Sequence, residues 1–175
     1  MHVVDGLYED HDKILEALAL LEEAVRRLES DRDVARTVSE LLEFLSKFAD
    51  QRHHGKEELL LFPELEKRGV PLHGDPIGVM VCEHGMGRYM LRNAAKALER
   101  VAKGDRDALS LLKHYVESYT SLLREHIEKE NNVLFQMARE LIAEGELVAE
   151  ARAIEEQVGH EELLKRLESL KASLR

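Results

Sequence analysis

The stretch HGKEELLLF at residues 54–62 and the stretch HIEKENNVLF at residues 126–135 share one pattern. Each contains a histidine, a glutamate four residues later, and an apolar run that ends in phenylalanine. Residues four apart on a helix lie on one face, so each stretch places an imidazole beside a carboxylate. His11 and His84 lie in two further helical stretches, in phase with the apolar positions. If four helices direct these side chains into a shared interior, the side chains can bind a metal. The pattern therefore predicts a metal site.

The composition favours one helical domain that spans residues 1–175. Hydrophobic residues make up 44% of the chain and charged residues 34%, whereas aromatic residues make up only 5%. A chain of this length buries roughly 70% of its unfolded surface as a single domain. Ala, Leu, Glu, Lys and Arg dominate, and they favour helix over strand.

The net charge of −10 argues against nucleic acid or an anionic membrane as a partner. No apolar run approaches the roughly 20 residues of a membrane span. The polar N-terminal stretch lacks the features of a signal peptide, and the single cysteine, Cys82, allows no intrachain disulfide. We therefore expect a cytoplasmic protein, and a homo-oligomer is compatible with the sequence.

Four apolar stripes with helical spacing predict four long helices. Pro63 should kink the second helix or end its regular part. Short connections between long helices imply antiparallel neighbours, so we expect an all-α, up-down-up-down four-helix bundle over about residues 5–145. The last residues, about 146–172, predict an additional C-terminal amphipathic helix, with Gly159 as a candidate break.

Helical phase separates the neighbouring pairs His53/Glu57 and His54/Glu58. At about 100° per residue, with Phe48 as zero, Glu58 lies about 80° and His54 about 120° from the apolar stripe. His53 lies about 140° away and Glu57 lies opposite the stripe. We therefore expect His54 and Glu58 to point inward. Metal loss on substitution of Glu57 but not of Glu58 would instead assign the site to His53.

The candidate ligands share an inward phase on the four predicted helices. They are His11, His54, Glu58, His84, His126 and Glu130. Imidazole and carboxylate together suit iron, manganese or zinc, and a glutamate can bridge two ions about 3.5–4 Å apart. Without a metal, burying these carboxylates would cost several kcal/mol per ion. Other charged positions, including Lys56, Glu83 and Glu128, are expected on solvated faces.

The strings HHGKEE at 53–58, EHGMGR at 83–88 and HIEKEN at 126–131 together resemble the hemerythrin-like HHE cation-binding domain family. The resemblance implies a non-haem di-iron site inside the bundle, in which zinc or manganese can replace iron. It implies terminal histidine ligands and bridging glutamates at the positions given above. Arg88 stands where oxygen-carrying hemerythrins have a further histidine, which favours handling of iron, nitric oxide or peroxide over oxygen carriage.

Two functions follow from such a site, and the sequence leaves both open. One is reaction with a small oxidant such as O2, peroxide or NO. The other is a binding or sensing module for iron, O2 or NO without turnover. A purely structural zinc site is disfavoured, because such sites are closed and tetrahedral and often contain cysteine.

Overall fold

The computed structural model describes every residue from Met1 to Arg175 and contains only helices and their connections, which confirms the all-α prediction. The α-helices are α1 (Val3–Arg27), α2 (Ala35–Leu45), α3 (Phe62–Lys67), α4 (Ile77–Ala102), α5 (Asp107–Lys129), α6 (Phe135–Leu141), α7 (Val148–Val158) and α8 (His160–Ser173). A 3-10 turn, η1 (Arg32–Val34), precedes α2, and three segments are π-helical: η2 (Ser46–His54), η3 (Glu57–Leu61) and η4 (Glu130–Leu134).

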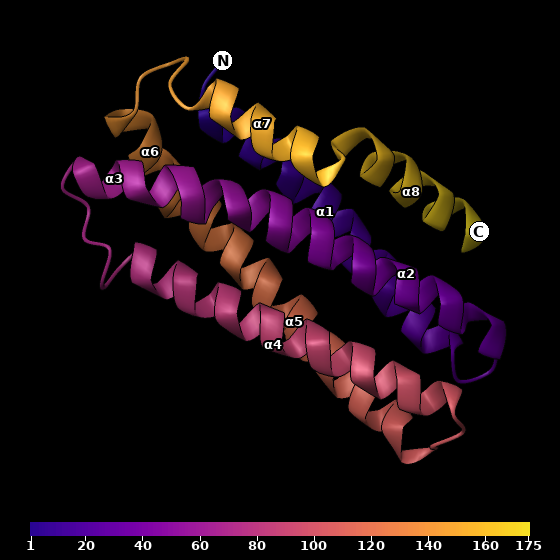
Figure 1. Ribbon diagram of the computed structural model, residues 1–175. Helices are drawn as coiled ribbons and strands as arrows, with labels where there is room; N and C mark the ends of the chain where they lie inside the picture. The colour runs from indigo at the N-terminus through magenta and orange to yellow at the C-terminus, as the bar shows by residue number, and fades with distance from the viewer.

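Four long helical rods lie side by side along the molecule (Figure 1). The first is α1, and the third is α4. The second runs without interruption from α2 through η2 and η3 to α3, and the fourth from α5 through η4 to α6. Successive rods run in opposite directions in Figure 1, with the connections at the two ends of the molecule.

The C-terminal residues form two helices, α7 and α8, and the expected helix is divided at Gly159, the candidate break. Gly159 separates α7 from α8 and has φ 78°, in the left-handed region that favours glycine. α7 packs against η2 and α8 packs against α2, so both helices lie along the outside of the four rods (Figure 1). Leu163, Leu167 and Leu170 of α8 are buried in the larger hydrophobic core. These helices are therefore part of the folded domain.

Two hydrophobic cores occupy the interior of the rods. The larger has 29 buried residues, including Phe44, Phe48 and Tyr119. The smaller has 14, including Phe62 and Phe135. Each of the four rods passes from one core to the other. At least one buried histidine lies on each rod near the boundary between the cores, and the second and fourth rods also have a buried glutamate there. A polar layer is therefore enclosed between two apolar ones.

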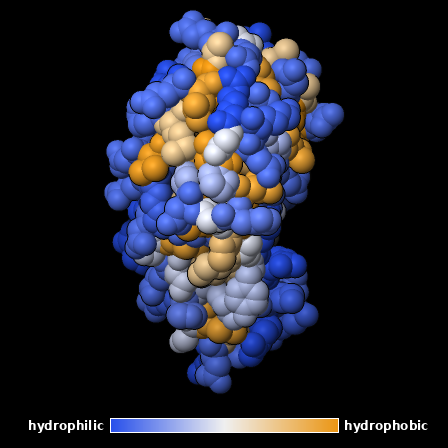
Figure 2. Space-filling view, turned by 90° about the vertical axis from the view of Figure 1, so that its left-hand side faces the viewer, coloured by the Kyte–Doolittle hydropathy of each residue, from blue (hydrophilic) through white to orange (hydrophobic).

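Hydrophilic residues cover most of the face seen in Figure 2, and hydrophobic residues form small patches among them. None of the helices combines the length and the apolar composition that a membrane span would require.

Candidate metal centre

Two pairs of histidines converge in the polar layer. The Nε2 atoms of His11 on α1 and His53 on η2 lie 3.1 Å apart, and those of His84 on α4 and His126 on α5 also lie 3.1 Å apart. All four residues are buried. Two imidazole nitrogens bound at right angles to one ion, each about 2.0–2.1 Å from it, would be about 3 Å apart. The spacing of each pair therefore fits one metal ion.

Two buried glutamates span the histidine pairs. Glu130 places Oε2 3.0 Å from His11 Nε2 and Oε1 3.0 Å from His126 Nε2. Glu57 places Oε1 3.8 Å from His53 Nε2 and Oε2 3.4 Å from His84 Nε2. Each carboxylate thus directs one oxygen to each pair, which is the arrangement needed to bridge two ions.

The nitrogen and oxygen atoms at the centre would be better satisfied by a metal ion than by hydrogen bonds to one another. Neither oxygen of Glu57 has a hydrogen-bond partner, although the residue is 0% exposed. A buried carboxylate without partners costs several kcal/mol. The groups present are imidazole nitrogens and carboxylate oxygens, a combination that suits iron, manganese or zinc.

The outward ring nitrogen of each paired histidine faces an oxygen. The Nδ1 contacts are His11 to Asn131 Oδ1 at 2.8 Å, His53 to Asp10 Oδ2 at 3.3 Å, His84 to Glu58 Oε1 at 2.7 Å, and His126 to Glu83 Oε2 at 2.9 Å. When Nδ1 carries the proton and donates to these oxygens, the Nε2 lone pair faces the centre. Metal-binding histidines are generally oriented in this way.

In the metal-free protein the carboxylates favour protonated imidazoles. Burial lowers the pKa of His53, but the negative charge of Glu57 and the hydrogen bond to Asp10 outweigh it and raise the pKa to about 9. Burial also lowers the pKa of His84, and Glu57 and Glu58 raise it to about 9. Since a ligating imidazole must be neutral, metal binding would release these protons.

A fifth histidine, His54, lies beside the His84/His126 pair. Its ring stacks on that of His84, with centroids 3.8 Å apart and an interplanar angle of 13°. It is buried, and neither ring nitrogen has a hydrogen-bond partner. Burial and the neighbouring imidazoles lower the pKa of His54, so the ring is neutral. The structure brings one nitrogen from each of these three histidines within 4.8 Å of the others.

The structure reverses the expected positions of Glu57 and Glu58. Glu57, expected opposite the apolar stripe, is 0% exposed at the centre, whereas the side chain of Glu58 is 29% exposed and contacts the outward nitrogen of His84. The expectation was wrong because it assumed 100° per residue throughout. η2 and η3 are π-helical and have more residues per turn. Between Phe48 and Glu57 this smaller rotation per residue brings Glu57 round to the centre.

The repeated sequence pattern contains the signal for the correct register. The backbone N–H of Phe62 bonds the carbonyl of Glu57, and the N–H of Phe135 bonds that of Glu130. Each glutamate therefore begins a π-helical turn that ends at a phenylalanine five residues later. Alignment of the two stretches on these phenylalanines matches Glu57 with Glu130, and the histidine four residues before Glu57 is His53.

Two charged residues that were expected on solvated faces instead make an ion pair or a hydrogen bond near the centre. Lys56 is 2% exposed, with its Nζ 2.7 Å from Asp10 Oδ2. Glu83 is mostly buried and accepts from His126. Periodicity could not identify either position, because their partners are distant in sequence.

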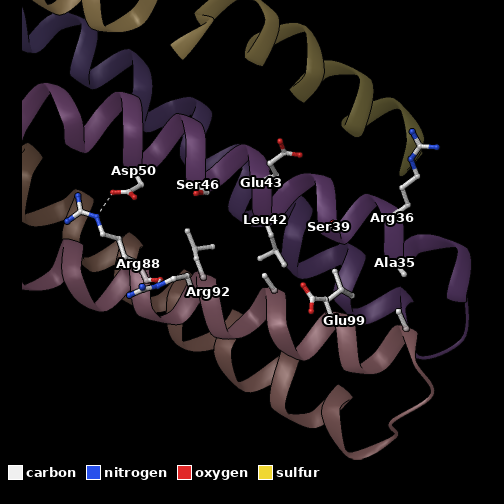
Figure 3. A pocket seen from close by; sticks show the side chains of 14 residues that line it. Ala35, Arg36, Ser39, Leu42, Glu43, Ser46, Asp50, Arg88, Arg92 and Glu99 are labelled. Atoms are coloured by element: carbon white, nitrogen blue, oxygen red, sulfur yellow. Dashed lines mark hydrogen bonds and ion pairs between the residues drawn. The ribbon is translucent and has the colours of Figure 1, made fainter. Parts of the chain in front are cut away.

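Arg88 lies at the edge of the centre. Its Nη2 is 2.7 Å from Glu58 Oε1, and its Nε is 2.7 Å from Asp50 Oδ1. Figure 3 shows the Asp50–Arg88 pair at one end of a groove of about 850 Å³ between α2 and α4. Asp50 Oδ1 also lies 3.5 Å from Nδ1 of His54. The ion pair therefore separates the groove from the buried histidines.

Comparison with known proteins identifies a Hemerythrin HHE cation binding domain over residues 2–138. The chain belongs to this family. It is similar to an uncharacterized protein of Mycobacterium tuberculosis, with 25% identity over 154 residues that cover 87% of this chain and 60% of that protein. It is also similar to the iron-sulfur cluster repair protein YtfE of Yersinia pseudotuberculosis, with 29% identity over 143 residues, 78% of this chain and 62% of that protein. The chain thus spans about 60% of the length of these curated relatives.

Proposed function

We propose that the chain is a di-iron protein whose centre binds or reacts with small oxidants such as O2, peroxide or NO. In this proposal Glu57 and Glu130 would bridge the two ions. His11 and His53 would bind one ion, and His54, His84 and His126 would bind the other. Glu57 replaces Glu58 as the first bridge, and Glu58 orients His84 instead. The four rods form the up-down-up-down bundle around these ligands.

One observation carries the proposal: each of two fully buried carboxylates directs one oxygen to one histidine pair and its other oxygen to the second pair. Membership of a cation-binding family supports it. The similarity to a protein named for iron-sulfur cluster repair supports iron as the metal.

Iron in such a site supplies redox chemistry and coordination positions that exchange small ligands. The protein's own groups have three roles. The outward hydrogen bonds hold each paired Nε2 toward the centre. The two hydrophobic cores exclude water from both sides of the polar layer. The Asp50–Arg88 pair restricts the end of the groove that is nearest to His54.

The test is metal analysis together with optical spectra of protein purified and reconstituted with ferrous iron without oxygen. We expect two irons per chain, and spectra that change on addition of O2, peroxide or NO. One metal or none after reconstitution would contradict the di-iron assignment. Zinc or manganese in protein as first purified would not, because such sites bind the metal that is available. Repeated consumption of peroxide indicates turnover, whereas a single stoichiometric change indicates a binding module.

A further inference from the structure

A buried network of charges connects the candidate metal centre to helix α7. Asp10 on α1 contacts His53 Nδ1, at 3.3 Å, and also bonds both Arg52 and Lys56, with 2.7 Å between its Oδ2 and Lys56 Nζ. On the far side of these two cations is Glu155 of α7. Its Oε1 lies 2.9 Å from Arg52 Nη2 and 2.7 Å from Lys56 Nζ.

The charges in this network balance. Arg52 and Lys56 are each 2% exposed, and such cations are almost never buried without partners. Two positive charges face two carboxylates, Asp10 and Glu155, so the network is neutral. Without Glu155 it would carry one excess positive charge beside His53. That charge would oppose a metal cation, and both buried cations would compete with His53 for Asp10.

Glu155 lies on a part of the chain outside the recognised family domain, which ends at residue 138. α7 packs on η2, the segment that carries His53, and Ala151 of α7 is buried in the smaller hydrophobic core. The side chain of Glu155 is 21% exposed, whereas Glu156 beside it is exposed to solvent. α7 therefore places one carboxylate against the centre and directs its neighbour away.

We propose that Glu155 is a positioning residue for the metal centre. By sharing Arg52 and Lys56 with Asp10 it limits their competition with His53 for that carboxylate, and it couples docking of α7 to metal binding at the His11/His53 pair. The proposal rests on the metal centre proposed above. Coupling between two binding events is reciprocal, so metal binding should also stabilise docked α7.

The first test compares Glu155→Gln with Glu156→Gln in a zinc titration against a chromophoric chelator. Zinc is a redox-silent probe of the same ligands. Loss of a group that orients a metal ligand typically weakens binding 10–100-fold. We expect a loss of about that size for one of the two ions in Glu155→Gln, and unchanged binding of both in Glu156→Gln.

A rescue experiment separates charge balance from simple anchoring of α7. The double variant Lys56→Gln/Glu155→Gln again has a neutral network, with Arg52 facing Asp10. We expect it to recover most of the affinity that Glu155→Gln loses. If Glu155 only anchored α7, the second substitution would weaken the anchor further and would not restore zinc binding.

Hydrogen exchange in the wild-type chain provides a test that does not depend on a variant folding. We expect amides of residues 148–158 to exchange more slowly with zinc bound than after chelation. Unchanged exchange, or a Glu155→Gln variant that binds both ions as Glu156→Gln does, would overturn the coupling and leave the metal centre intact. A wild-type chain that binds neither zinc nor iron would overturn both proposals.

Discussion

Glu57→Gln tests the corrected assignment most directly, because the amide keeps the shape of the side chain and removes its charge. Glu57 directs one oxygen to each histidine pair, so both of the proposed ions would lose a ligand. The ion at His11 and His53 would keep three protein ligands, and the other ion would keep four. We expect less than one metal per chain after dialysis, compared with two in the wild type.

The same substitution should abolish the stabilisation that metal gives the fold. At a free metal concentration 1,000 times its Kd, one bound ion adds about 4 kcal/mol to the free energy of unfolding. For domains of about 150–250 residues, each kcal/mol changes Tm by about 2–4 °C. Wild-type protein should therefore lose about 8–16 °C or more on chelation, measured by circular dichroism. Glu57→Gln should melt at the same temperature with and without chelator.

Two control variants are compared with Glu57→Gln to show that the loss of metal is specific to Glu57. Glu58→Gln removes the negative charge that faces the outward nitrogen of His84, so we expect binding about 10–100-fold weaker but two ions at saturating metal. Glu128→Gln lies on the exposed face of α5 and should change nothing. If Glu58→Gln empties the centre while Glu57→Gln retains both metals, the π-helical register proposed here is refuted.

Three further outcomes follow from the structure. In the metal-free fold the pKa of His53 and that of His84 are raised from the ordinary 6.5 to about 9, so the stabilisation from these groups is fully present below about pH 6.5 and is lost as the pH rises through 9. The Tm of chelated protein should therefore fall over this range, and a rising Tm would contradict the assignment. Arg88→Met removes the pair with Asp50 at the end of the groove, so extraction of metal by a chelator should accelerate several-fold while metal content stays at two. Leu167→Ala in α8 truncates a side chain that is 1% exposed and should lower the free energy of unfolding, measured in denaturant, by about 2–5 kcal/mol. A loss of less than about 1 kcal/mol would mean that α8 is not part of the core.

The helical class and the inward positions of His11, His84 and His126 could be predicted because the rods are amphipathic over long distances. Apolar spacing is preserved where helices are regular, as along α1, where His11 falls in phase between Leu7 and Ile14. The same periodicity placed His84 and His126 correctly in the interior. The burial of one apolar stripe per helix depends only on the spacing of nearby residues, so it can be predicted wherever the backbone keeps 3.6 residues per turn.

The register of the second rod could not be predicted from that rule, because its backbone changes to π-helical turns before the glutamates. The charge network around the outward nitrogen of His53 also could not be predicted from the local sequence pattern. Asp10 and Glu155 are 145 positions apart in the sequence, and only the packing of α7 on η2 brings both to Arg52 and Lys56. Lys56 therefore looked like part of a solvated face, although two carboxylates partner it in the interior.

The two repeated stretches build two similar halves, and their differences make the centre unequal. Phe62 stacks on His84, and Phe135 stacks on His11, with interplanar angles of 17° and 11°. His54, however, aligns with Ile127, an apolar core residue.

The extra imidazole therefore has no counterpart on the other side of the centre. In the proposed assignment the His84/His126 side has three histidines, whereas the His11/His53 side has two and leaves more positions open to a small ligand. The open side is also the one whose His53 is held by Asp10 and, through Arg52 and Lys56, by Glu155 of α7. Any control that α7 exerts should consequently affect ligand binding at that side more than metal binding at the other.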